Sequence, residues 1–159
     1  MSQFLVENSD LILTLILAVG LGMVIGLERL LVHKEAGIKT HAMVSLGSAL
    51  FIIISEMIAI KYIDTFAFDP TRIASQIIVG IGFLGAGAII LHGSRLTGLT
   101  TAGGLWVTAG IGMAVGFGFF SLAVIVTVLV LLILTVITII ERPVRRMLDK
   151  NLPHEDTIR

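Results

Sequence analysis

The sequence contains no cysteine among its 159 residues, and this absence excludes disulfides, thiolate metal sites and cysteine nucleophiles. Charged residues are scarce as well, at 14% of the chain, and eleven basic residues balance eleven acidic ones. A formal net charge of zero gives no electrostatic argument for binding nucleic acid, so no nucleic-acid partner is expected.

Motifs for catalysis and cofactors are also missing. No GxxxxGK[ST] phosphate loop occurs, and the GxGxxG match at residues 80–85 lies inside an apolar run with no strand before it. The four histidines have no pair at zinc-ligand spacing, and no Ser-His-acid arrangement can be inferred. We therefore expect no cofactor and no enzymatic activity, and leave any metal site unassigned.

Apolar residues make up 56% of the chain, and the mean hydropathy is +1.04. A water-soluble domain of this size could not bury so much apolar surface, so the composition indicates an integral membrane protein. Five apolar runs predict an all-α, polytopic membrane bundle of five transmembrane helices, at about residues 11–31, 42–60, 70–91, 101–119 and 121–140.

The predicted transmembrane domain covers residues 1–141, and a short basic tail follows at 142–159. The tail either touches anionic lipid or docks a partner. The first run has no basic segment before it and no small-residue cleavage site, so it is interpreted as a retained span. Nine of the eleven basic residues fall on one side of the predicted topology. The positive-inside rule then places the N-terminus outside and the C-terminus in the cytoplasm.

The third predicted span carries the most informative polar residues. Asp69 is placed to cap the helix, with Pro70 in its first position. One helical face then carries Arg72, Gln76, Gly80, Phe83 and Gly87. Because an unpaired amide is unfavourable in lipid, this face is predicted to point at protein or water. The polar group is either structural or functional.

The second predicted span has a polar stripe of its own, formed by His41, Ser45, Ser48 and Ser55 with Glu56 beside it. The serines could bond to their own backbone carbonyls. Glu56 could sit among headgroups, pair with Lys61 or Arg72, or coordinate a cation.

Small residues predict close helix packing in the first, third and fourth spans, at Gly22, Gly26, Gly80, Gly87, Gly104, Gly112 and Gly116. Glu28 and Arg29 end the first span and point in different directions, so they need not pair. With Lys39, His41 and their neighbours they form a charged ring, either solvated or a binding surface. Trp106 is predicted to pack inside the bundle.

A set of ordered motifs resembles the MgtC/SapB family. They are Gly26-Leu-Glu-Arg29, Ala36-Gly-Ile-Lys-Thr-His41, Asp69-Pro-Thr-Arg-Ile-Ala74, the glycine-rich run 80–87, Gly98-Leu-Thr-Thr101 and Leu105-Trp106. Lys39 stands where the family usually has arginine, which loses bidentate geometry. We expect no soluble C-terminal domain of the kind that longer members carry, so regulation attributed to that domain is not carried over.

The resemblance implies a bacterial inner-membrane protein linked to growth in low magnesium and to survival of pathogens inside host cells. It also implies restraint of the F-type ATP synthase, the possible partner complex. The residues that match the family are Glu28, Arg29, Lys39, Thr40, His41, Asp69, Arg72, Gln76 and Trp106.

Two functions remain open from the sequence. One is a non-enzymatic regulator that contacts another membrane complex through its helices, as the glycine stripes suggest. The other is a transporter or channel for a cation, Mg²⁺ or another, or for a small solute. A homo-oligomer, at least a dimer, is expected because five helices are few for a conduit.

Overall fold

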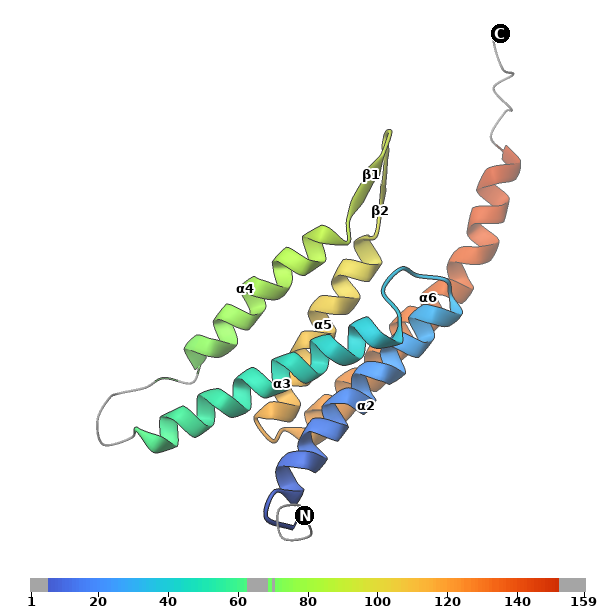
Figure 1. Ribbon diagram of the computed structural model, residues 1–159. Helices are drawn as coiled ribbons and strands as arrows, with labels where there is room; N and C mark the ends of the chain where they lie inside the picture. The colour runs from blue at the N-terminus through green and yellow to red at the C-terminus, as the bar shows by residue number, and fades with distance from the viewer. Residues whose placement is uncertain (1–5, 63–68, 70, 152–159) are drawn as a thin grey trace.

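The computed structural model describes residues 6–62, 69 and 71–151, with 141–151 described as backbone alone. These residues form the helices α2 (Ser9–Leu31), α3 (Ile38–Lys61), α4 (Thr71–Gly87), α5 (Leu99–Gly116) and α6 (Phe120–Asn151). An antiparallel hairpin of β1 (Ile90–His92) and β2 (Arg95–Thr97) joins α4 to α5 (Figure 1).

The all-α membrane bundle is confirmed, although five equal spans is a generous count. Within the described residues, four helices are long and apolar enough to cross a membrane: α2, α3, α5 and the Phe120–Ile140 part of α6. The shorter α4 has 17 residues and falls just below that length.

The third predicted span ends too late. A helix was predicted through residue 91, but α4 stops at Gly87, where the Ala88 and Ile89 amides donate to carbonyls three residues back. Gly98, between β2 and α5, lies against the residue that follows α4. It has a φ of +87°, and a side chain there would collide with the Ala88 carbonyl, so glycine permits the close approach of hairpin base and helix. The apolar residues 88–91 fit a helix equally well, and their periodicity could not reveal this turn.

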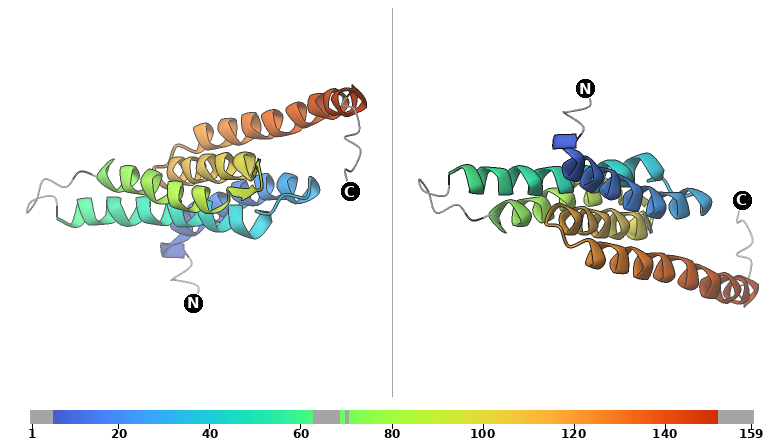
Figure 2. Two further views of the ribbon diagram at one scale, coloured as in Figure 1. Left: turned by 90° about the horizontal axis from the view of Figure 1, so that it is seen from above. Right: turned by 90° about the horizontal axis from the view of Figure 1, so that it is seen from below.

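Helix α5 lies in the middle of the bundle and contacts α2, α3, α4 and α6 (Figure 2). The core lies where these helices meet, around Ala18, Ile25, Ala49, Ile111, Val115 and Ala123. Helix α6 lies at one edge and exposes most of its apolar side chains. It continues to Asn151, eleven residues beyond the predicted end at 140. The rest of the predicted tail, 152–159, lies outside the described residues.

Glycines allow the central helices to approach each other. A Cβ on Gly22 would lie 2.6 Å from the His41 carbonyl oxygen, and one on Gly26 would meet the backbone at residues 37 and 38. A Cβ on Gly112 would collide with the Ser45 carbonyl, and one on Gly116 would lie 2.8 Å from Ile52 Cβ. The packing predicted for these glycines of α2 and α5 is therefore confirmed, with α3 as their common partner.

Candidate functional site

A buried ion pair lies where α2 ends. Arg29 is only 2% exposed, and its Nε donates to Glu28 Oε2 at 2.5 Å. The expectation that these neighbours point apart was wrong, because the flexible arginine stem bends back to the adjacent carboxylate. A buried guanidinium needs such a counter-charge. It is the only ion pair between side chains that the structure describes.

His41 lies in the first turn of α3 and is fully buried. Its Nδ1 is 3.0 Å from the Gly37 carbonyl oxygen, which can only accept, so Nδ1 donates; when the ring is neutral, Nε2 therefore carries the lone pair. Neither Nε2 nor the Ser45 Oγ has a hydrogen-bond partner among the described residues, and both atoms are buried. The four residues of the polar stripe, His41, Ser45, Ser48 and Ser55, are all buried in α3, which the sequence analysis did not predict.

The predicted charged ring is divided by the fold. Arg29 and His41 are buried, whereas Lys39 and Thr40 on the first turn of α3 are exposed, as are His33, Lys34 and Glu35 in the preceding turn. Glu56 is half-buried further along α3. Among the described residues it forms no ion pair, neither with Lys61 nor with Arg72. The site residues predicted from the sequence therefore do not form one cluster.

Asp69 caps α4 as predicted. Its Oδ1 accepts hydrogen bonds from the Thr71 hydroxyl at 2.7 Å and from the Thr71 amide at 2.9 Å. These bonds, first from the hydroxyl and then from the amide, hold the pKa of Asp69 below its usual value. Arg72 is exposed and is not within ion-pair distance of Asp69 or Glu56.

The polar face of α4 does not pack inside the chain. Gln76, Gly80, Phe83 and Gly87 are all exposed, Phe83 by 81%, and a Cβ on either glycine would have no neighbour within 4 Å. The expected packing of Gly80 and Gly87 is therefore not formed within this single chain.

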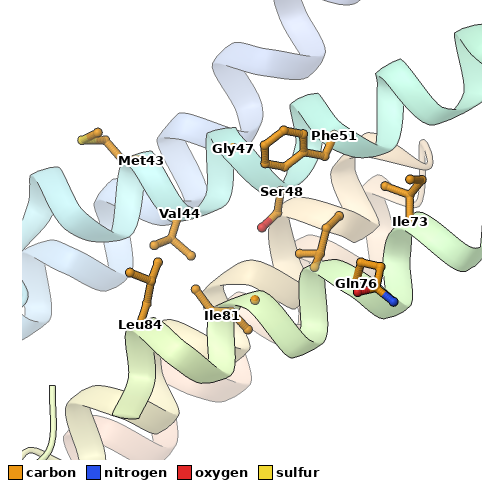
Figure 3. A pocket seen from close by; sticks show the side chains of 11 residues that line it. Met43, Val44, Gly47, Ser48, Phe51, Ile73, Gln76, Ile81 and Leu84 are labelled. Carbon is orange, nitrogen blue, oxygen red and sulfur yellow. The ribbon is translucent and has the colours of Figure 1, made fainter. Parts of the chain in front are cut away.

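A groove of about 540 Å³ runs between α3 and α4 (Figure 3). Gln76 and Gly80 line its α4 side, Ser48 contributes a hydroxyl from α3, and the other lining side chains are apolar. Sequence reasoning missed the α3 side of this groove. Met43, Gly47 and Phe51 recur every four residues there, and that second stripe was the available signal.

Trp106 corrects another expectation. Its side chain is 53% exposed on α5, although packing within the bundle was predicted. It lines a second apolar groove of about 360 Å³ formed by residues of α4, α5 and α6. Gly104, two residues earlier and on the opposite face, is buried, and a Cβ there would lie 3.4 Å from His41 Nε2 of α3.

The described residues contain no group of three histidine, aspartate or glutamate side chains that could hold a metal ion. What the fold does bring together is a buried polar seam between α2, α3 and α5, and a separate exposed groove beside α4.

The family model described as the MgtC family matches residues 15–143, which is most of the chain. The chain belongs to the MgtC family. The match covers both the buried seam and the exposed face of α4, and it confirms the resemblance seen in the motifs.

Curated relatives agree with this assignment. The chain is 45% identical over 116 residues to "Protein MgtC" of Salmonella typhimurium LT2, covering 73% of this chain and 47% of that protein. It is 42% identical over 119 residues to the "Putative magnesium transporter YhiD" of Escherichia coli K12, covering 74% and 55%. An uncharacterized Haemophilus influenzae protein is 42% identical over 158 residues, covering 88% and 66%. The chain thus spans about half to two thirds of the length of these relatives. No solved structure matches it.

Proposed function

We propose that this MgtC-family protein is a non-enzymatic regulator of the bacterial inner membrane that acts by lateral contact with another membrane protein. The observation that carries the proposal is the exposed face of α4. Gln76 and Gly80 lie on it beside the apolar groove to α3. An amide in the bilayer requires a partner, and exposed glycines allow another helix to approach closely.

The groove has the chemistry of a helix-binding surface. Its walls are aliphatic and aromatic side chains of α3 and α4, with the Ser48 hydroxyl and the Gln76 amide as the polar groups (Figure 3). A partner helix with apolar residues and one hydrogen-bonding side chain at matching depth suits it. The membrane-embedded part of an F-type ATP synthase is the partner that the family resemblance implies, and a second copy of this chain in a dimer is the other.

Photo-crosslinking in native membranes tests this proposal. A crosslinking amino acid replaces Phe83 on the α4 face, and the matched control replaces Ile125, which is 57% exposed on α6. We expect one or a few discrete protein adducts from position 83 and only background from position 125. The masses of the adducts separate a dimer from a different partner. Identical background from both positions contradicts the proposal.

Orientation in the membrane belongs to the same proposal. The turn between α2 and α3, which carries Lys34, and the hairpin between α4 and α5, which carries Arg95, lie toward one end of the bundle (Figure 1), which we place in the cytoplasm. Reaction of a membrane-impermeant thiol reagent with cysteines placed at exposed Lys34 and Lys61 tests this. Labelling of position 61 alone in intact spheroplasts is expected.

Cation transport is the second candidate. The name of the Escherichia coli relative and the buried polar stripe on α3 favour it. Mg²⁺, K⁺, Na⁺ and H⁺ flux into proteoliposomes is the test, with the Asp69→Asn/Arg72→Ala variant as control. Selective flux through the unaltered protein that is lost in the folded variant supports transport. The absence of flux through correctly folded unaltered protein supports the regulator.

A further inference from the structure

Two polar atoms of the buried seam lack a partner, and they belong to neighbouring turns of one helix face. His41 Nε2 and Ser45 Oγ are both buried in α3 without a hydrogen bond. Residues four apart in a helix lie one above the other, so the two groups share a side of α3. A buried polar group left without a partner is costly, and native structures satisfy nearly all of them.

The opposing helix supplies the space. Gly104 of α5 is buried, yet a Cβ built on it would have His41 Nε2, at 3.4 Å, as its one neighbour within 4 Å outside the adjoining backbone. Elsewhere on the same α5 face the fit is tight, since a Cβ on Gly112 would collide with the Ser45 carbonyl. Because Gly104 has no side chain, there is room beside His41 Nε2. This room does not extend along the interface to Gly112.

The hydrogen-bonding capacity of the seam identifies what fits this room. Because Nδ1 donates to the Gly37 carbonyl, Nε2 can only accept when the ring is neutral, which is the state that the proposal requires. The Thr108 hydroxyl is no donor to it, since it already donates to the Gly104 carbonyl at 2.8 Å. The occupant must therefore be a small molecule that donates to Nε2 and bonds a serine hydroxyl.

We propose that one water molecule binds between α3 and α5 beside Gly104, donating to His41 Nε2 and bonded to Ser45 Oγ. Buried waters of this kind satisfy polar groups that the chain leaves without partners. The water links the two helices where no side chain of α5 can. This site is separate from the α4 groove, so its failure in a test leaves the proposed function untouched.

Solid-state NMR of ¹⁵N-histidine-labelled protein in lipid bilayers detects the water directly. A His41→Gln sample identifies the His41 signals. We expect the neutral Nδ1–H tautomer, with magnetisation transferred from water to His41 Nε2. Gly104→Ala should abolish that transfer by placing a methyl group against the nitrogen. Gly103→Ala is the matched control on the same helix, because a Cβ there has no neighbour within 4 Å, and should retain it. Absence of transfer in the unaltered protein, a charged ring, or transfer unchanged by Gly104→Ala overturns the proposal.

Thermal stability is an independent test, because a bound water and an unpartnered hydroxyl predict Tm changes of opposite sign. Ser45→Ala should lower Tm if the hydroxyl holds a water, whereas deleting a truly unpartnered hydroxyl should raise Tm. The control is Thr127→Val, which removes a hydroxyl that already bonds within its own helix, to the Ala123 carbonyl at 2.8 Å. We expect a smaller change there. A Tm for Ser45→Ala at or above that of the unaltered protein contradicts the proposed role of Ser45.

Discussion

The glycines of α5 and those of α4 follow similar sequence patterns and reach opposite outcomes. Gly112 and Gly116 lie directly against the backbone and side chains of α3. Gly80 and Gly87 have nothing within reach of a built Cβ. A small-residue stripe therefore shows that a helix can be approached closely, but it does not say whether the approaching helix belongs to the same chain. These two glycines of α5 pack against another helix of the same chain, whereas Gly80 and Gly87 of α4 face no described residue within 4 Å of a built Cβ.

The two arginines provide the largest contrast between these regions. Arg29 is buried against Glu28, whereas Arg72 is exposed on α4 without an ion pair to a described residue. Arg29→Ala strands a largely buried carboxylate and should cost about 3 kcal/mol in unfolding free energy, by analogy with other broken buried pairs. Arg72→Ala should cost less than about 0.5 kcal/mol. Denaturation in detergent micelles measures both.

The double variant Glu28→Leu/Arg29→Met sharpens this test. Replacing both members of a buried pair by apolar groups is often neutral. We expect it to recover most of the stability that Arg29→Ala loses. No recovery would mean that Arg29 stabilises the fold through contacts other than Glu28.

Two glycines give the next contrast. Gly112→Ala forces a methyl group into the Ser45 carbonyl and should destabilise the protein by about 1–3 kcal/mol, as overpacking does. Gly80→Ala meets open space, and its unfolding free energy should stay equal or rise slightly because alanine favours helix. Thermal unfolding of the two purified variants is the measurement. Equal losses would show that α4 is packed more closely than the structure indicates.

A substitution of Gln76 tests binding by the α4 face separately from folding. Gln76→Leu removes an exposed amide, so stability should change by less than about 0.5 kcal/mol. If the α4 face binds a partner, crosslinking from position 83 should fall several-fold in the same variant. Thr14→Val on α2 provides a control, because its hydroxyl bonds the Asp10 carbonyl within its own helix. Unchanged crosslinking in Gln76→Leu would remove the amide from the contact.

Asp69 gives the smallest effect and a defined pH dependence. Its bonds to Thr71 lower its folded pKa below the unfolded value of about 3.9. The stabilisation is therefore complete above that value and is lost as pH falls through the folded pKa. The Tm difference between the unaltered protein and Asp69→Ala should be constant near neutral pH and shrink below about pH 4. A difference that persists at pH 2 would mean that the carboxylate charge is not what stabilises the cap.

Sequence reasoning succeeded for features that a short stretch of sequence determines. Hydropathy predicted the membrane bundle, the spacing of His41, Ser45 and Ser48 placed them on one face of α3, and Asp69 was predicted to cap α4. It failed where tertiary geometry decides. The end of α4 depends on the meeting of Gly98 with the Ala88 carbonyl, two groups ten residues apart. The exposure of Trp106 depends on where α4 and α6 lie around α5. Neither of these contacts produces a periodic pattern in the sequence that could have predicted it.

The length of α4 has a consequence for the lipid around it. At a rise of 1.5 Å per residue its 17 residues span about 26 Å, less than the roughly 30 Å of a bilayer's hydrocarbon layer. The 23 residues of α2 and 24 of α3 span it fully. A bilayer that α4 crosses would have to thin beside it, unless flanking residues snorkel or α4 associates with another helix. Sharing a thinned patch with another protein of short span would relieve part of this mismatch, which is a second physical reason to test α4 as a contact face.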